Sequence, residues 1–463
     1  MRRIRTLGFI MIVAVLLCVA LAFCACDDME DDTIEELVAG KNGDLSMYEV
    51  CENYFQNDDK FVIRKVKDEY KDKIATAIIP GNVYCTDWNA FEGCKNLKKI
   101  IVQEGVNFLG RESFKDCKKL ESIELYDGFS SIYKGMFMNC TSLEEVVLPD
   151  SVRYIETDAF KGCTKLKSIK MSDGVLIVGG AFDDTALCDN VIDGMVYINN
   201  IAYKYVGNMP KNTTYKLKEG TINAASHVFS NCDGLKHLVL PDSMEYIPSA
   251  LAFECKNLLS LTIGRNFKKI EYITGAWWRV VPVIDYSPRL VEVYNRSDIE
   301  MSKEFFYTIE NGDQMEILHI YDETGHSALE TRDNGQVYLV TDAEKVLVEC
   351  TTDSDCVQIE SGTTAINRYA FCDCENLKEI IIPEGVTDMS FTSVVNCPNL
   401  TSITVPTSLK CFNNVFSVTK DIEHLIKYLG TMEQWNNLEK NIYSLTDTVI
   451  CSDGTINVAA KTD

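Results

Sequence analysis

The chain has 463 residues, of which 46% are hydrophobic and 25% charged, a composition typical of a folded protein. Its 69 acidic and 45 basic residues give a formal net charge of −24. The electrostatic field of such an acidic chain repels phosphate backbones, so we expect no nucleic-acid partner. Cationic partners and divalent ions are compatible with this charge.

The N-terminus has the pattern of an export signal over residues 1–25. Arg2, Arg3 and Arg5 precede an uncharged, mostly aliphatic run at residues 7–23. A retained membrane anchor is the alternative, because about 20 apolar residues suffice to span a bilayer. Acidic residues dominate 26–47, which predicts a hydrated spacer.

Ala25 and Cys26 resemble a bacterial lipoprotein cleavage box, in which a small residue precedes the cysteine that is acylated. The resemblance implies a lipid anchor on Cys26, and hence a membrane as one partner. A signal peptide that is simply cleaved is the other possibility.

A period of 23 residues dominates the rest of the chain, and each repeat contains a phrase such as Ala159-Phe160-Lys161-Gly162-Cys163. A fixed period of this length predicts stacked coils. The same repeat position is occupied by Cys94, Cys117, Cys140, Cys163, Cys232, Cys255, Cys374 and Cys397. We predict a buried ladder of structural thiols, because coils about 4.8 Å apart are too widely spaced for an easy disulfide.

Three cysteines outside this register are better candidates for disulfides. Cys350 stands near Cys356, and Cys372 stands near the ladder residue Cys374. The sequence does not decide between bridged and free thiols at these positions.

Alternation predicts one strand in each period. In Leu143 to Leu148, Val146 and Leu148 point to one side, Glu145 and Val147 point to the other, and Pro149 ends the strand. Val152 and Ile155 predict a short arm on the opposite wall, with Phe160 in the interior. The equivalent strands are 97–102, 120–125, 166–171, 235–240, 258–263, 377–382 and 400–405, and we expect them to stack into one continuous parallel sheet.

The solenoid is predicted to span residues 48–463. Residues 48–88 form a degenerate first coil, the N-terminal cap, and residues 406–463 form a terminal segment. The period breaks at 188–224 and 300–362, where hairpin-like strand pairs predict insertions that project from one face.

The motif Leu-x-x-Ile/Val-x-Ile/Leu-Pro, followed by Val, Ile, Ala-Phe and Cys, is most complete at 143–163 and 377–397. It resembles the BspA-like, or Treponema-pallidum-type, leucine-rich repeat proteins, and residues 425–436 resemble their closing segment. The resemblance implies an α/β leucine-rich repeat solenoid, right-handed and β-dominated, whose 23-residue coils build a parallel sheet. It also implies a cell-surface adhesin for components of host or neighbouring cells.

The outward positions of the strands predict a partner-binding strip. Its members are Lys99, Ile101, Ser122, Glu124, Glu145, Val147, Ser168, Lys170, His237, Val239, Ser260, Thr262, Glu379, Ile381, Ser402 and Thr404. Curved repeat sheets commonly bind macromolecules there. The alternative is that exposed apolar residues only raise strand propensity.

Signals for catalysis are poor. The histidines at 227, 237, 319, 326 and 424 are scattered, and no zinc or nucleophile motif is present, so we expect no enzyme activity, metal or cofactor. Asp353-Ser354-Asp355 reads as a solvated turn. An enzyme would need His237 or His326 beside a thiol and a carboxylate.

The sequence therefore predicts a non-catalytic surface protein that binds an extracellular protein or glycan. A glycan-capture accessory lipoprotein is the second hypothesis, with Trp277 and tyrosines of the insertions stacking on sugars. Trp277 and Trp278 are either an exposed hot spot or a seal for an irregular coil.

Overall fold

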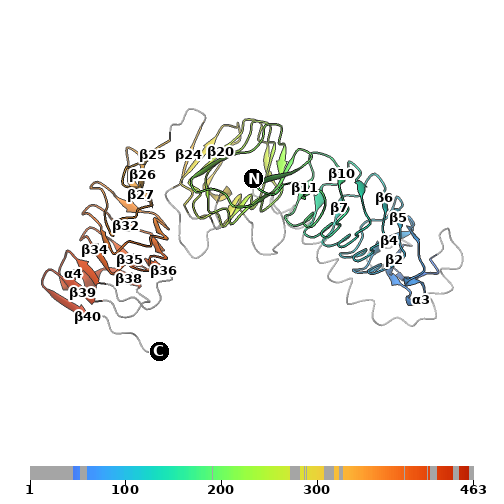
Figure 1. Ribbon diagram of the computed structural model, residues 1–463, viewed down its shortest axis with the longest axis horizontal. Helices are drawn as coiled ribbons and strands as arrows, with labels where there is room; N and C mark the ends of the chain where they lie inside the picture. Colours follow the sequence, from blue (N-terminus) through green and yellow to red (C-terminus); the bar gives the residue numbers. More distant parts are fainter. Residues whose placement is uncertain are drawn as a thin grey trace.

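The computed structural model describes residues 45–52, 60–189, 191–271, 282–285, 287, 289–306, 318–322, 327–390, 392–413, 415–417, 425–441 and 448–457. The export signal, Cys26, most of the acidic spacer, Trp277, Trp278, His326 and His424 lie outside these ranges. The described chain is an arch of stacked coils (Figure 1). Its helices are the short α3 (Asp68–Lys71), α4 (Met432–Asn437) and the 3-10 turn η1 (Lys303–Phe305), so the predicted β-dominated solenoid is confirmed with very little α structure.

One coil shows how the repeat sequence determines the backbone. Strand β8 (Glu145–Val147) lies in the main sheet, Pro149 follows it in a turn, and β9 (Tyr154–Ile155) lies in a second wall. Val146 is buried while Glu145 and Val147 are exposed, as the alternation predicts. Each of the eight predicted strands is present, although most begin two residues later than expected because the leading leucine still belongs to the preceding turn.

The turn before each ladder cysteine requires two residues in the left-handed region. In the coil that ends at Cys163, these are Asp158 (φ 59°) and Gly162 (φ 72°), on either side of Ala159-Phe160-Lys161. All eight ladder cysteines directly follow a residue of positive φ, namely Gly93, Asp116, Asn139, Gly162, Asn231, Glu254, Asp373 and Asn396. Gly, Asn and Asp tolerate this conformation best, which explains their prevalence there.

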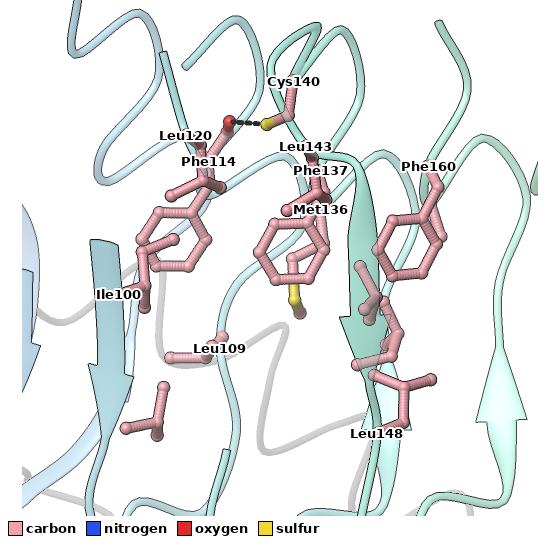
Figure 2. Packing of buried hydrophobic residues seen from close by; sticks show 14 of the residues in the cluster. Ile100, Leu109, Phe114, Leu120, Met136, Phe137, Cys140, Leu143, Leu148 and Phe160 are labelled. Carbon is pink, nitrogen blue, oxygen red and sulfur yellow. Dashed lines mark hydrogen bonds between the residues drawn. The ribbon is translucent and has the colours of Figure 1, made fainter. Parts of the chain in front are cut away.

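Between Phe91 and Phe182 the core contains a continuous stack of aromatic rings, part of which Figure 2 shows beside the Cys140 thiol. The ring centroids of Phe114 and Phe137 are 5.6 Å apart, and those of Phe137 and Phe160 are 5.3 Å apart, with the rings nearly parallel. Each ring is fully buried. Each coil therefore depends on its neighbours for its core, as expected for a solenoid.

The coils are organised in three arrays, at residues 45–189, 191–322 and 327–457, and each array begins with an antiparallel hairpin. In Figure 1 the first array forms the blue-to-green limb of the arch, the second its crown, and the third the orange-to-red limb. The hairpins are β1 (Tyr48–Glu52) with β2 (Phe61–Val66), β12 (Gly194–Ile198) with β13 (Ile201–Val206), and β26 (Gln336–Val340) with β27 (Lys345–Cys350). Strand β25 (Leu329–Thr331) adds to the third hairpin.

The main sheet is therefore divided, and the expectation of one continuous sheet was wrong. Its members in the first array are β3 (Thr76–Ile79), β5 (Lys99–Val102), β6 (Ser122–Leu125), β8 and β10 (Ser168–Lys170). In the second array they are β14 (Thr213–Lys216), β17 (Leu235–Val239), β20 (Ser260–Ile263), β23 (Glu292–Asn295) and β24 (His319–Tyr321). In the third array they are β28 (Cys356–Gln358), β31 (Glu379–Ile381), β34 (Ser402–Val405), β37 (Leu425–Tyr428), β39 (Thr448–Cys451) and the antiparallel β40 (Gly454–Asn457).

The second wall is built of shorter strands. In the first array these are β4 (Val83–Thr86), β7 (Ser131–Ile132), β9 and β11 (Leu176–Ile177), and in the second β15 (Asn223–Ala224), β18 (Tyr246–Pro248) and β21 (Lys269–Glu271). In the third they are β29 (Ala365–Ile366), β32 (Asp388–Met389), β35 (Cys411–Asn413) and β38 (Glu439–Asn441). A third side pairs β16 (Phe229–Ser230), β19 (Ala252–Phe253) and β22 (Ile284–Asp285), and likewise β30 (Phe371–Cys372), β33 (Val394–Val395) and β36 (Phe416–Ser417).

The described hairpins of the segments 188–224 and 300–362 do not project from the solenoid, contrary to expectation. They lie within the stack, and the second strand of each pairs in parallel with the following second-wall strand. The second strand of the N-terminal hairpin pairs in the same way, so the three hairpins are equivalent structural units. Backbone hydrogen bonds mark the equivalence, from Val66 N to Ala90 O, from Tyr205 N to Val228 O, and from Cys350 N to Ala370 O.

The first and second arrays are stacked end to end. Tyr203 of β13 takes the next position after Phe182 in the ring stack, at 5.8 Å, and its hydroxyl accepts a hydrogen bond from Phe182 N at 2.8 Å. The side chains of β12 and β13 contribute to the cores of both arrays. Both faces of this hairpin therefore carry apolar side chains, one face toward each array.

The terminal segment closes the third array with α4. Thr431 caps its N-terminus in a capping box with Gln434, and Trp435 is buried against Phe412 and Tyr428. The final antiparallel strand β40 ends the parallel ladder.

Candidate functional site

The outward face of the first array presents two lanes of side chains that run across its coils. One lane is Ile78, Ile101, Glu124, Val147 and Lys170, and the other is Thr76, Lys99, Ser122, Glu145 and Ser168. Val147 is 60% exposed and Ile78 is 46% exposed, both large values for aliphatic side chains. Lys99 Nζ lies 2.5 Å from Glu124 Oε1 and links the two lanes. We call this surface the first-array strip.

The third array presents the equivalent lanes. Glu379, Ile381, Ser402 and Thr404 are all partly exposed there. Lys427 Nζ lies 2.7 Å from Glu379 Oε1, and this contact holds the pKa of the carboxyl below its usual range. Ile450, at the last coil of this face, is 42% exposed.

In the second array the predicted strip is partly covered. Ser260 and its neighbour Glu292 are buried, and His237, Val239 and Thr262 are only partly exposed. His237 Nδ1 lies 2.7 Å from Ser260 Oγ, and burial lowers the pKa of the imidazole. The sixteen predicted positions therefore do not form one continuous exposed surface.

The cover is the hairpin that opens the third array. Its apolar face, Val337, Leu339, Val346 and Val348, packs with Leu259 and Val291, which directly precede β20 and β23. Glu292 Oε1 accepts from Ala328 N at 2.7 Å, and His319 Nε2 lies 3.0 Å from Glu344 Oε1. In the first array the residues equivalent to Leu259 are charged, for example Glu144 and Lys167.

A buried ion cluster completes this contact between the second and third arrays. Arg289 and Glu349 are each 2% exposed, and Arg289 Nη1 lies 3.3 Å from Glu349 Oε1. Lys236 Nζ lies 2.7 Å from Glu349 Oε2, and Arg289 also donates to the carbonyl of Tyr369. This joint was not predicted from the sequence. A signal was present in Leu259 and Val291, which put apolar residues where other repeats have charged ones.

The ladder cysteines are placed for structure. All eight are buried, and the thiols of Cys117, Cys140 and Cys163 donate to the carbonyls of Phe91, Phe114 and Phe137, at 3.1, 3.3 and 3.0 Å. Burial raises the pKa of the Cys140 thiol well above its usual range, which disfavours the reactive thiolate.

The disulfides considered for Cys350 with Cys356 and for Cys372 with Cys374 are absent, and all four are free thiols. Cys350 is buried, whereas Cys356 is exposed at the edge of the main sheet. Cys374 Sγ instead donates to the carbonyl of Cys350 at 3.5 Å. Of these four residues, Cys374 therefore keeps the ladder contact to the preceding coil, and none forms a cross-link.

Among the described residues, no group of three or more His, Cys, Asp or Glu side chains is arranged to hold a metal ion. Asp353, Ser354 and Asp355 are exposed before β28. No helix within the described ranges is long and apolar enough to cross a membrane.

Comparison with known families gives matches to the BspA type leucine-rich repeat region, in six copies, at residues 69–190, 177–274 and 346–453. These ranges cover well over half of the chain. The chain belongs to the BspA type leucine-rich repeat family. In this BspA type chain the three matched ranges lie one in each array, apart from a short overlap at the first joint.

Solved structures that match this chain include a leucine-rich cell surface protein from Faecalibacterium prausnitzii, with 16% identity, 87% of this chain and 97% of that chain covered, and a TM-score of 0.29. A leucine-rich repeat protein from Bacteroides ovatus has 18% identity, 87% and 98% coverage and a TM-score of 0.25. The T. pallidum leucine-rich repeat protein has 20% identity, 50% and 84% coverage and a TM-score of 0.24. No curated protein matches the chain.

Proposed function

We propose that this BspA type protein is exported, held at the cell surface by acylated Cys26, and acts without catalysis as an adhesin. Its ligand is a protein of host or neighbouring cells. The acidic spacer places the repeats away from the membrane surface. The main binding surface is the first-array strip, with the equivalent face of the third array as a second contact.

One observation carries this proposal. The face of the second array that corresponds to the strip already binds a polypeptide, namely the β26–β27 hairpin of the same chain. The contact combines a small apolar centre at Leu259 and Val291 with hydrogen bonds to Glu292 and an ion pair to Lys236. Repeat-protein sheets of this kind therefore accept an extended peptide or hairpin by ordinary packing and hydrogen bonding.

The first-array strip offers the same ingredients but has no intramolecular cover among the described residues. Val147 and Ile78 supply apolar area, while Glu145, Lys170 and the Lys99–Glu124 pair supply charge at the rim. An apolar centre with charged surroundings is the usual anatomy of a protein-binding surface.

The test is binding of the purified full-length protein to an array of extracellular-matrix and cell-surface proteins. Val147→Asp and Glu145→Lys are expected to weaken a saturable interaction by at least about tenfold, as substitutions at interface hot spots do. Ile192→Asp is the matched control, because Ile192 is an aliphatic residue 93% exposed outside the strip. Binding that survives both strip substitutions but is lost with Ile450→Asp would move the site to the third array, and an absence of protein ligands would refute the adhesin.

A further inference from the structure

Aromatic side chains gather on the second wall of the first array, away from the strip. The ring centroids of Tyr84 and Phe108 are 6.0 Å apart, and those of Phe108 and Tyr133 are 6.2 Å apart, with both pairs edge to face. Trp88 follows β4 in the first coil and is 47% exposed, and Tyr154 of β9 is also 47% exposed. These five residues form what we call the aromatic wall.

The fold does not require aromatic residues at these positions. The third array has an equivalent second wall, built from an equivalent hairpin and from the parallel pairs β27 with β29 and β29 with β32. By register, its residues at the five corresponding positions are polar, namely Thr364, Arg368, Asp388, Asn413 and Glu439. The Trp and Tyr side chains of the first array are half-exposed, and equivalent positions of the third array are polar. Their presence therefore indicates recognition of a ligand rather than a packing requirement.

Several polar groups around the aromatic wall are paired with one another. The Arg111 guanidinium lies over the Trp88 ring, 5.8 Å from its centroid, and its Nη2 is 3.8 Å from Glu156 Oε2. Arg64 Nε lies 3.9 Å from Asp87 Oδ2. Asn107 Nδ2 donates to the Tyr84 hydroxyl at 3.1 Å. The wall thus combines ring surfaces with planar donors and acceptors, and both Arg111 and Arg64 lie beside carboxylates.

This chemistry favours a neutral ligand with both apolar faces and hydroxyl groups. A pyranose ring has one face of C–H groups that packs on an aromatic ring, and edge hydroxyls that hydrogen-bond to Asn, Arg and carboxylate groups. An anionic glycan is disfavoured, because Arg64 and Arg111 lie beside carboxylates and the whole chain has a net charge of −24. A protein partner is less well suited, since charged pairs interrupt the apolar surface at its centre.

The spacing of the wall also fits a chain of sugars. Aromatic residues recur from coil to coil, and neighbouring coils are about 4.8 Å apart, close to the length of one pyranose unit in an extended polysaccharide. Gly110 keeps the coils close at this corner, because a Cβ there would lie 2.2 Å from Asp87 O. We propose that the aromatic wall, centred on Trp88, binds a neutral polysaccharide along the axis of the solenoid.

Affinity electrophoresis of the full-length protein tests this proposal, in native gels that contain starch, laminarin, xylan, galactomannan or, as anionic arms, polygalacturonate or heparin. At least one neutral polysaccharide is expected to retard the protein. Trp88→Ala and Tyr154→Ala are expected to weaken the retardation by at least about tenfold, and Trp88→Phe by less because a ring is retained.

Two controls separate this surface from others. Tyr246→Ala replaces the tyrosine that corresponds to Tyr154 in the second array, and Val147→Asp alters the first-array strip, so both should leave the retardation unchanged. Retardation by anionic polymers alone, by no neutral polysaccharide, or equally in wild type and Trp88→Ala would overturn the proposal. So would a Trp88-dependent protein ligand with no glycan binding. None of these results bears on adhesion through the strip, which Val147→Asp tests by itself.

Discussion

The thiol of Cys140 donates to the carbonyl oxygen of Phe114, one coil earlier in the stack, at 3.3 Å (Figure 2). Each such bond joins the two most regular features of the repeat, the ring stack and the cysteine ladder. The donor and the acceptor are both buried, so neither group can turn to water if the other is removed.

Removal of this thiol is expected to lower the free energy of unfolding, and its replacement by a hydroxyl is expected to lower it less. Cys140→Ala leaves a small cavity and an unpaired carbonyl, and should lower the free energy of unfolding by about 1–3 kcal/mol. Cys140→Ser keeps a donor and should cost less. Urea unfolding measures both. The exposed Cys356→Ala is the control and should change stability by less than about 0.5 kcal/mol. Equal losses for Ala and Ser would show that packing alone explains the ladder.

The close approach of neighbouring coils at Gly110 predicts that a larger residue there destabilises the protein. An added Cβ would lie 2.2 Å from Asp87 O and 2.7 Å from Trp88 N, both backbone atoms. Gly110→Ala should therefore destabilise the protein by about 1–3 kcal/mol through overpacking. Gly174→Ala is the matched control, since no atom lies within 4 Å of a Cβ at that position. A shift in the thermal midpoint that is no larger for Gly110→Ala than for Gly174→Ala would contradict the steric explanation.

The coil itself could be predicted from sequence because its signals are local and repeated. Val146 and Leu148 alternate with Glu145 and Val147, Pro149 ends the strand, and Gly162 provides the left-handed turn before Cys163. Each of these preferences acts within a few residues. Repetition then distinguishes the pattern from chance.

The division into arrays could not be predicted in this way. A hairpin such as β12–β13 has the same alternation whether it projects into solvent or lies between two stacks. What differs is its partner, since Tyr203 completes the ring stack of Phe182 and Leu339 covers Leu259. These contacts join residues 21 to 80 positions apart and leave only weak traces in sequence. The exposure of the strip depends on them.

For the buried ion cluster at the second joint, removal of one charged partner should lower the free energy of unfolding much more than replacement of the ion pair by apolar residues. Glu349→Gln leaves Arg289 and Lys236 without their carboxylate, and should cost about 3–5 kcal/mol. The double variant Arg289→Met with Glu349→Leu removes most of the buried charge and should recover much of that loss.

Denaturant unfolding gives the stabilities, and hydrogen exchange of β26 and β27 reports whether the hairpin leaves the second array. Glu144→Gln, which disrupts an exposed pair with Lys167 at 2.8 Å, should cost no more than about 1 kcal/mol. If Glu349→Gln behaved like this control, the cluster would not hold the arrays together.

Alkaline pH is expected to weaken the third array, because burial raises the pKa of the Cys350 thiol from 9.0 to about 12. Above pH 9 the unfolded chain loses this proton while the folded chain retains it. The contribution to stability is therefore complete below pH 9 and decreases as the pH rises to 12, by about 1.4 kcal/mol per pH unit for one group. Tyr338 adds to the effect, since burial raises its pKa from 10.0 to about 12.

The measurement is the free energy of unfolding from pH 8 to pH 11. Cys350→Ala should decrease the slope above pH 9 relative to wild type, because one of the titrating groups is gone. Val348→Ala removes buried apolar atoms from the same strand without a titrating group, so it should lower stability equally at every pH and leave the slope unchanged. An unaltered slope in Cys350→Ala would mean that the thiol titrates normally in the folded protein, and that the buried position of Cys350 does not protect it from water.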